Sequence, residues 1–309
     1  MRNPSRLPPL KALAAFEAAG RHLNFSGAAQ ELGTTQPAVS QQVAALEADL
    51  GVALFRRLHR GVALTAAGAE LLAAVTAGLA TIEDATIAIR RQAGPKTLQI
   101  LTDFGFAAWW LMARLGALGE HMPGVEIRVL TAQHEIDLRR EQVDVAVLFG
   151  DAARWPGHRV TLLFEEQVHP VCTPAFLARQ GVALDQADPA QLRLLHVRDP
   201  LPKRWASWAD WFAAQGQEID KRPQDLRFDN YQLVLQATLL GQGVALGWRP
   251  LIDDLQAGGH LVLLAGQPLR TERGYHLIEP TARLGDPIVA QFRRWLLEER
   301  DRTARGVTG

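Results

Sequence analysis

The sequence predicts a chain of two structural classes, a mainly α-helical head that ends in a short β-hairpin and a larger α/β body. Three observations lead to this prediction. The first 65 residues contain three segments of helical periodicity and then one alternating segment. A proline-free helical stretch follows over residues 65–92 and ends at Gly94-Pro95. From residue 97 onward, strand-like and helix-like segments alternate, as in α/β folds.

The composition is that of a globular protein, because 48% of the 309 residues are hydrophobic and 21% are charged. The sequence contains no run of 18 apolar residues and no signal peptide, so we expect a cytoplasmic protein without a membrane span. The single cysteine, Cys172, excludes an intramolecular disulfide and a cysteine-based zinc site. Gly241-Gln242-Gly243 follows a helical segment and precedes a strand, the reverse of a dinucleotide motif. We therefore predict no cofactor and no metal.

Charge is spread unevenly along this chain, although its formal net charge is zero. The first 65 residues carry seven basic side chains against four acidic ones, and the remainder carries 26 basic and 29 acidic. The head therefore has a net charge of +3 and the body of −3. A basic head on a mildly acidic body favours a local contact with nucleic acid.

The first two helices of the head are short. In the first, apolar side chains recur at helical spacing within residues 7–19, at Leu10, Leu13, Phe16 and Ala19. The second is expected at about 26–32, with Ser26 as its N-cap and Leu32-Gly33 as its end. A tight turn through Gly33 then leads to the next helix, and this arrangement predicts a helix-turn-helix.

The third helix is expected over residues 36–50, with Pro37 in its first turn and Gly51 after its end. Its apolar stripe consists of Val39, Val43, Leu46 and Leu50. Residues 54–65 alternate and turn at Arg60-Gly61, which predicts a small wing with basic residues near its tip. Phe16, Val39, Leu46 and Phe55 are expected in the core of the head.

The long helix over residues 65–92 carries an apolar seam of heptad spacing. Its members are Leu72, Val75, Leu79, Ile82, Thr86 and Ile89. A solitary helix that exposed this seam to water would be unstable, so we expect it to pack against a copy of itself.

The body alternates between strands and helices. Strands are predicted at 97–102, 125–131, 143–149, 160–164, 168–172, 194–196, 244–247, 261–264 and 274–278. Helices are predicted at 106–118, 134–141, 174–180, 204–215, 230–240, 249–257 and 286–299. This alternation predicts βαβ units and a mostly parallel sheet, and two such lobes fit in about 200 residues.

The head resembles the LysR-type transcriptional regulators in seven segments that occur in the family's order and spacing. They are residues 10–16, 24–29, 35–43, 46–47, 50–51, 54–57 and 64–68. Further segments of the body resemble the glycine-cleavage-activator-like branch of that family, at residues 143–147, 155–157, 170–174 and 241–246. The resemblance therefore covers the whole chain.

The resemblance implies a domain organisation and a function. It implies a winged helix-turn-helix over residues 1–65, a linker and dimerisation helix over 66–93, and an effector-binding domain over 94–309. That last domain is expected to be two-lobed and similar to periplasmic binding proteins, with lobe I at about 94–165 and 270–300 and lobe II at about 166–269. The implied function is a sequence-specific transcriptional regulator that responds to a small molecule. Its implied partners are operator DNA, RNA polymerase and further copies of itself as a homodimer or homotetramer.

The third helix is expected to lie in the major groove of DNA, with its first turns nearest the bases. Carried over from the family, the groove-facing positions are Gln36, Pro37, Ser40 and Gln41. Ser26, Arg57 and Arg60 match the family's contacts to the DNA backbone and minor groove. Ser26 serves as a helix cap, a DNA contact or both.

Ligands of open α/β sheets bind beyond the carboxyl ends of the strands. The residues at these ends, or at the helices that follow, are Thr102, Asp103, Gly105, Phe106, Thr131, Phe149, Asp151, Asn230 and Trp248. Related proteins often place a serine in the loop after the first strand of this domain, whereas this chain has Asp103-Phe104-Gly105-Phe106. Asp103 is therefore either a ligand-facing carboxylate or a cap of the next helix.

The effector class follows from charge and aromatic content. The body contains all eight tryptophans, at positions 109, 110, 155, 205, 208, 211, 248 and 295. An acid beside aromatic faces suits a cationic or quaternary ammonium effector. The competing hypothesis is a neutral or acidic metabolite held by Thr102, Thr131 and backbone N–H groups. A solute-binding protein and an α/β enzyme are the other two classes of protein, but the DNA-reading head argues against the first and no catalytic set supports the second.

Overall fold

The computed structural model describes residues 7–57, 61–92, 96–132, 138, 143–198, 205–219 and 222–306. The chain divides into two compact units, Met1–Gly94 and Pro95–Gly309. Within the described ranges, no helix is long and apolar enough to cross a membrane.

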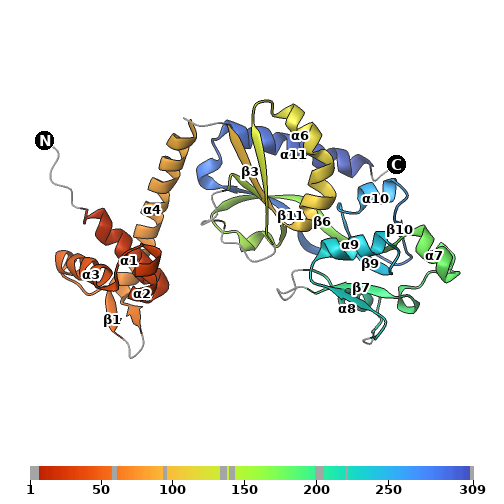
Figure 1. The fold of residues 1–309 in the computed structure, drawn as a ribbon, viewed down its shortest axis with the longest axis horizontal. Helices are drawn as coiled ribbons and strands as arrows, with labels where there is room; N and C mark the ends of the chain where they lie inside the picture. The colour runs from red at the N-terminus through yellow and green to blue at the C-terminus, as the bar shows by residue number, and fades with distance from the viewer. Residues whose placement is uncertain are drawn as a thin grey trace. The chain divides into compact units, whose positions relative to one another are not determined.

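The amino-terminal unit combines helices with a two-stranded hairpin (Figure 1). Its elements are α1 Leu10–His22, α2 Phe25–Glu31, α3 Gln36–Leu50, β1 Phe55–Arg57, β2 Val62–Leu64 and α4 Ala66–Gln92. The hairpin is antiparallel and pairs Phe55 with Leu64. Helix α3 ends at Gly51, whose φ of 72° lies in the left-handed region that favours glycine. The predicted winged helix-turn-helix is confirmed.

A small apolar core holds α1, α2, α3 and the first half of α4 together. Phe16, Val39 and Leu46 are almost fully buried in it, as predicted. The half-buried ring of Phe55 packs on the core and meets Phe16 edge to face, with 5.5 Å between ring centroids. Leu50 was predicted in the same stripe, but it is 40% exposed because the buried stripe of α3 ends one turn earlier, at Leu46.

The N-cap of α2 is Asn24, so the prediction of Ser26 as the cap is wrong. The side-chain oxygen of Asn24 accepts hydrogen bonds from the backbone N–H groups of Ser26 at 2.8 Å and of Gly27 at 3.4 Å. Asn24 also has the extended backbone of a cap residue, whereas Ser26 already lies inside the helix. Ser26 is exposed, so its hydroxyl is accessible to a partner.

The apolar seam of α4 has two different environments. Val75 is buried, and Leu72 and Leu79 are half-buried, all against the core of their own head. Ile82 and Ile89 are 53% and 68% exposed. The first half of the seam therefore packs on its own head, and the packing of the seam against a second copy stays a prediction.

The larger unit is an α/β body. Its strands are β3 Thr97–Thr102, β4 Glu126–Thr131, β5 Val145–Gly150, β6 His158–Cys172, β7 Leu194–Val197, β8 Leu226–Phe228, β9 Val244–Arg249, β10 Val262–Leu263 and β11 Leu269–Pro280. Its helices are α5 Phe104–Phe106, α6 Leu115–His121, α7 Pro174–Gln180, α8 Trp208–Ala214, α9 Tyr231–Leu239, α10 Asp253–Ala257 and α11 Pro287–Gly306. A π-helical turn, Ala107–Leu111, and a 3-10 turn, Met112–Arg114, connect α5 to α6. Further 3-10 turns are Ala152–Arg154, Leu184–Gln186, Pro189–Gln191 and Thr281–Arg283.

The strands of the described body form one sheet in the order β4-β3-β5-β11-β6-β9-β7-β8, with β10 beside β6. Pairing is parallel in the groups β4-β3-β5 and β9-β7-β8. It is antiparallel wherever β6 or β11 takes part. The prediction of a mostly parallel sheet is therefore wrong at the centre, because two long strands of opposite direction join the two parallel groups.

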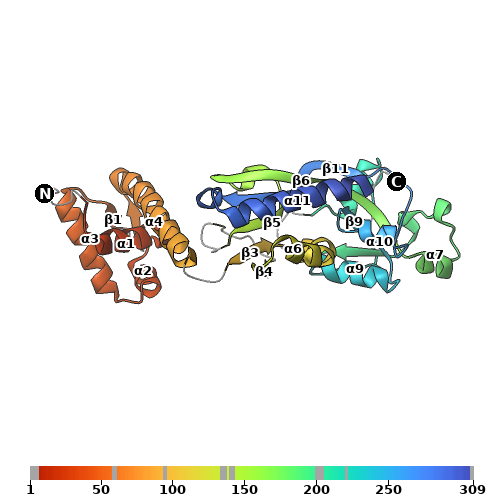
Figure 2. The same cartoon turned by 90° about the horizontal axis from the view of Figure 1, so that it is seen from above.

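These long strands divide the body into two lobes. Lobe I contains β3, β4 and β5, with α11 beside α6 (Figure 1). Lobe II contains β7 to β10 and α7 to α10, and β6 and β11 run on from lobe I toward it (Figure 2). The strands predicted at 160–164 and 168–172 are one strand, β6, whereas β8 was not predicted. The helix predicted at 134–141 falls on residues outside the described ranges, except for Leu138.

Candidate functional site

The exposed side of α3 carries the residues predicted to read DNA. Gln36, Pro37 and Gln41 are exposed and Ser40 is half-buried. Residues four apart on a helix are neighbours, so Gln36 lies beside Ser40, and Pro37 beside Gln41. The buried side chains of the same helix, such as Val39, face the core. Helix α3 therefore presents a compact surface of amide and hydroxyl groups, which are able to hydrogen-bond base edges.

Hydrogen bonds fix the wing relative to α3 and α4. A side-chain oxygen of Glu47 accepts from the backbone N–H groups of Leu54 at 2.7 Å and Phe55 at 3.0 Å. The hydroxyl of Thr65 donates to the carbonyl of Ala53 at 2.8 Å and accepts from the N–H of Gly68 at 3.0 Å. Neither Glu47 nor Thr65 was predicted to have a structural role. Their roles depend on contacts between elements, which periodicity does not reveal.

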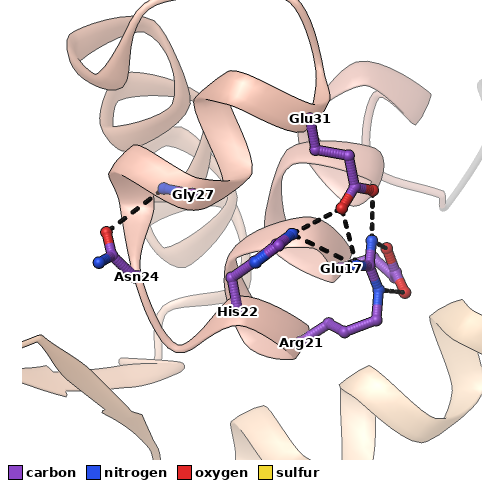
Figure 3. A network of polar contacts seen from close by, with 6 residues as sticks. All are labelled: Glu17, Arg21, His22, Asn24, Gly27 and Glu31. Carbon is purple, nitrogen blue, oxygen red and sulfur yellow. Dashed lines mark hydrogen bonds and ion pairs between the residues drawn. The ribbon is translucent and has the colours of Figure 1, made fainter.

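A polar network joins α1 to α2 beside the helix-turn-helix (Figure 3). Arg21 donates to Glu31 at 2.7 Å and to Glu17 at 3.2 Å, and His22 lies 2.6 Å from Glu31. The Arg21 and His22 hydrogen bonds lower the pKa of the Glu31 carboxyl to about 2. Glu17 and Glu31 therefore neutralise the charge of Arg21. The positive potential of the head comes from its other basic residues.

Two predicted DNA contacts lie in the wing. Arg57 is the last residue of β1, and its backbone pairs with Val62. Arg60 lies outside the described residues. Arg56, which precedes Arg57 in β1, is exposed.

Five aromatic side chains of the body gather in one place, here called the aromatic cluster. They are Phe149, Trp205, Tyr231, Trp248 and Tyr275. Phe149 is near the end of β5, Tyr231 begins α9, Trp248 is in β9 and Tyr275 is in β11. Both lobes thus contribute rings to the cluster, and every one of these four is at most 4% exposed.

Two buried carboxylates border the aromatic cluster. Asp103 accepts from the N–H of Phe106 at 2.9 Å and from the hydroxyl of Tyr275 at 3.3 Å. It is therefore the cap of α5, one of its two predicted roles. Glu166 accepts from the indole N–H of Trp248 at 2.8 Å and from Arg273 at 3.0 Å. The Arg273 guanidinium lies 5.8 Å from the ring centroid of Phe149, so a protein cation already approaches that ring.

A polar atom of Thr102 is also buried near these rings. Thr102 ends β3 and pairs with Val147 of β5. Its hydroxyl is fully buried and has no hydrogen-bond partner among the described residues. Because alternate residues of a strand share a face, Thr102 lies on the same side of β3 as the buried Ile100. A buried hydroxyl without a partner is unfavourable by itself and favours a ligand that supplies one.

Six of the nine predicted ligand residues lie in or beside the aromatic cluster. They are Thr102, Asp103, Gly105, Phe106, Phe149 and Trp248. At Gly105 an added Cβ would lie 3.3 Å from the ring of Tyr231, so glycine allows α5 to approach α9 closely. Phe106 meets Tyr275 with ring centroids 4.9 Å apart.

The other three predicted ligand residues are not shown in contact with the aromatic cluster. Thr131 is exposed at the end of the edge strand β4. Asp151 is exposed and caps a 3-10 turn, accepting from the N–H of Ala153 at 2.9 Å. Asn230 caps α9 by accepting from the N–H of Leu233 at 2.9 Å. The capping roles of Asp151 and Asn230 do not exclude a ligand contact.

Three residues of this site were missed as ligand candidates. Trp205 was predicted only as part of a helix at 204–215, but that helix, α8, begins at Trp208 and leaves Trp205 on the connection before it. Tyr275 lies inside β11, and Glu166 sits within a polar stretch of β6. A buried carboxylate requires a partner, and that of Glu166 is Arg273, 107 positions further along the chain.

Comparisons with known proteins agree with this architecture. Residues 91–301 match the LysR substrate binding domain, and residues 10–69 match the bacterial regulatory helix-turn-helix protein, lysR family. The glycine cleavage system transcriptional activator of Escherichia coli (strain K12) is 33% identical over 294 residues, which are 94% of each chain.

Solved structures share the fold. The effector domain of the transcriptional regulator AmpR of Pseudomonas aeruginosa is 27% identical, with a TM-score of 0.56 over 69% of this chain and 100% of that chain. ArgP from Mycobacterium tuberculosis is 21% identical, with a TM-score of 0.56 over 96% of this chain and 98% of that chain.

The head and body together define a regulator with a helix-turn-helix unit and a two-lobed effector-binding unit. The chain belongs to the LysR-type family of transcriptional regulators. The predicted resemblance to the glycine-cleavage-activator-like branch is confirmed by the relative from Escherichia coli.

Proposed function

We propose that this regulator reads its operator with α3, and that its binding to DNA changes when a small molecule occupies the aromatic cluster. The observation that carries the proposal is that each unit contains polar side chains that its own fold does not use, beside side chains that form its core. On α3, Gln36 and Gln41 are exposed while Val39 is buried. In the body, both lobes contribute rings to one cluster, and the Thr102 hydroxyl beside it has no partner among the described residues.

The DNA contacts that we propose follow the sequence assignment. Gln36, Ser40 and Gln41 contact base edges, and Pro37 packs against the groove. Ser26 contacts the DNA backbone, and Arg57 and Arg60 of the wing contact phosphates or the minor groove. Phosphate contacts supply affinity that falls with salt, whereas base contacts supply sequence preference. The two sets are therefore separable by experiment.

The proposed ligand residues are those at the strand ends together with the cluster. Thr102, Asp103, Gly105, Phe106, Phe149 and Trp248 surround the site, and Thr131, Asp151 and Asn230 lie at the ends of their strands or the start of α9. A ligand that contacts both lobes stabilises one arrangement of the lobes over others. This differential binding couples the effector to DNA.

For the effector we propose a positively charged metabolite, with choline- and betaine-like compounds as the first to test. Support comes from the electron-rich rings of Phe149, Tyr231 and Trp248, since such faces attract cations. The Arg273 guanidinium near Phe149 is an internal example of that attraction. Because the carboxylate of Asp103 caps α5, we expect the rings to attract a cationic effector more than this carboxylate does. A neutral or acidic metabolite held by Thr102 is the alternative.

We propose further that the protein is cytoplasmic, is not an enzyme, forms homodimers or homotetramers, and contacts RNA polymerase. The proposed domains are residues 1–65 for DNA binding, 66–93 for the linker, and 94–309 for effector binding. The exposed half of the α4 seam, at Ile82 and Ile89, supports self-association.

A titration with an operator fragment, selected from random DNA by the wild-type protein, tests the DNA assignment. Gln36→Ala and Ser40→Ala should each weaken binding by about 1–3 kcal/mol and relax the sequence preference. Arg57→Ala should weaken binding to all sequences and reduce its salt dependence. The control is Gln236→Ala, which removes an exposed glutamine from the effector-binding unit. Unchanged binding by all three head variants would refute the assignment.

Calorimetry with choline, glycine betaine, a neutral amino acid and a dicarboxylate tests the effector class. We expect one of the two quaternary compounds to bind, and Asp103→Asn, which keeps a capping oxygen, to weaken it. Tight binding of the dicarboxylate, unaffected by Asp103→Asn, would reject the cationic class and favour the alternative.

A further inference from the structure

Trp205 lies at the centre of the aromatic cluster. Its indole stacks on Phe149 with 4.6 Å between centroids and 8° between planes. On its other side it stacks on Tyr231, at 5.6 Å and 17°. Trp248 and Tyr275 meet it edge-on at 5.0 and 6.4 Å. The indole therefore occupies a flat slot with a ring on each face and rings at its edges, the two favoured geometries of aromatic pairs.

Trp205 differs from the four rings around it in two ways. Those rings belong to strands β5, β9 and β11 and to helix α9, whereas Trp205 lies on a connection two residues before the N-cap of α8. The four rings are at most 4% exposed, whereas Trp205 is half-buried. The slot is therefore built by regular elements, and the connection supplies its occupant.

The indole also joins the two lobes. Phe149 and Tyr275, in strands paired with each other, lie on the lobe I side, while Tyr231 and Trp248 belong to lobe II. A molecule that stacks between Phe149 and Tyr231 holds the lobes in one arrangement. Trp205 makes these contacts as part of the chain itself.

We propose that Trp205 is a tethered substitute for the effector, and that the effector carries, besides the positively charged group proposed above, a flat aromatic group that stacks between Phe149 and Tyr231 in place of the indole. This inference rests on the proposed function, because it takes the aromatic cluster to be the effector site. A flat group is required because the slot ring planes lie within 17° of the indole. Any flat aromatic group can stack on the rings of Phe149 and Tyr231, so the indole of Trp205 and the effector compete for the same two ring faces.

A small recess shares two walls with the slot. It is lined by Tyr231, Trp248, Ala206 and His196, among others. Ala206 follows Trp205 in the chain, so the recess and the slot adjoin. Burial lowers the pKa of His196, whose Nε2 lies 3.1 Å from Asp225.

Removal of the indole tests the proposal with full-length protein. Trp205→Ala should lower the melting temperature by about 10 °C, because it empties a site between aromatic rings. Free indole should then restore about half of that loss, while it leaves the wild type unchanged. Cyclohexanol, which is of similar bulk but not flat, should restore much less. Indole without effect on Trp205→Ala, or equal effects of indole and cyclohexanol, would overturn the proposal.

The matched control is Trp211→Ala, because Trp211 is a buried tryptophan of lobe II that packs on Trp208 and Phe212. Indole should not alter operator affinity of that variant, whereas it should change that of Trp205→Ala severalfold. If Trp205→Ala binds indole without any change in operator affinity, the slot between Phe149 and Tyr231 is supported, but the proposed coupling of the aromatic cluster to DNA binding is rejected. If Trp205→Ala does not fold, Trp205→Phe replaces it, and this variant must bind indole more tightly than wild type does.

Discussion

In the helix-turn-helix unit Gln36, Pro37 and Gln41, which are proposed to touch DNA, are exposed and lie opposite a small core. In the effector-binding unit, by contrast, four of the five rings of the aromatic cluster are buried core residues. Gln36 and Gln41 are exposed on α3. Tyr231 and Trp248 are at most 4% exposed and belong to the largest apolar cluster of the described chain. DNA is read from outside, but a small molecule is selected where water is removed.

This difference teaches that function and stability are separable in the head and coupled in the body. Changes on the exposed side of α3 should leave folding unaffected, while changes in the aromatic cluster should affect both folding and ligand binding. The sequence also offers a probe for each unit. All tryptophans and tyrosines lie in the body, so tryptophan fluorescence reports its unfolding alone, while circular dichroism reports both units.

The largest effect is expected from Trp248→Ala. This change removes a fully buried ring and the hydrogen bond that its indole donates to Glu166. We expect the free energy of unfolding of the body to fall by about 3–5 kcal/mol, measured by tryptophan fluorescence in urea. Trp248→Phe, which keeps most of the bulk, should cost about 1–3 kcal/mol. If Trp248→Ala lowers the free energy of unfolding of the body by less than 1 kcal/mol, the aromatic cluster is not part of the core, and the contrast between the two units fails.

The same difference between the units explains how far the sequence allowed prediction. Local signals define the head: the stripe of α3 and the glycine at its end predicted Gln36–Leu50 with both boundaries correct. The cap of α2 was misplaced because Asn24 and Ser26 are both good cap residues, and only the backbone geometry separates them.

The body depends on contacts that are distant in sequence. The polar residues around Glu166 interrupt the apolar pattern of β6, so one strand of fifteen residues was predicted as two. Glu166 is buried there because Arg273, on β11, pairs with it. Likewise, no local pattern places the Trp205 ring on Phe149, since stacking is a tertiary contact. For this reason the strand-end rule found Phe149 and Trp248 of the slot but missed Tyr275 and the occupant, Trp205.

Ile89→Asp tests whether the exposed half of the α4 seam has a partner. Because Ile89 is 68% exposed, the change should not affect the head core, but a charge buried between two copies is strongly unfavourable. We expect light scattering to show the loss of the dimer, with operator affinity at least about tenfold weaker, or 1.4 kcal/mol. Leu79→Asp is a poorer test, because Leu79 packs on its own head.

Ala80→Asp is the matched control, because it places the same charge on an exposed residue on the opposite side of α4. It should leave both mass and affinity unchanged. Equal masses for Ile89→Asp and wild type would mean that no copy covers the seam at this residue.

A smaller effect is expected from Thr65→Val, which keeps the side-chain volume but removes the hydroxyl that bonds to Ala53 and caps α4 at Gly68. The head should lose about 1 kcal/mol of stability, measured by circular dichroism, with an unchanged fluorescence transition for the body. The control is Thr81→Val, because the Thr81 hydroxyl donates to the carbonyl of Ala77 within α4 itself. Equal losses for the two variants would contradict the proposed link between wing and helix.

The smallest effect should come from Glu31→Gln, which breaks the pairing of α2 with Arg21 on α1. The Glu31 side chain is 40% exposed, so solvent screens the pair and we expect a loss of only about 0.2–1 kcal/mol at pH 7. The pKa of Glu31 is lowered in the folded state to about 2, from an ordinary value of 4.5. The stabilisation is therefore complete above pH 4.5 and is lost as the pH falls toward 2. Circular dichroism melts of wild type and Glu31→Gln should differ at pH 7 and converge between pH 4.5 and 2, while tryptophan fluorescence of the body shows no difference between them at any pH. A difference that persists unchanged at pH 2 would mean that the glutamate stabilises the head by packing and not by its charge.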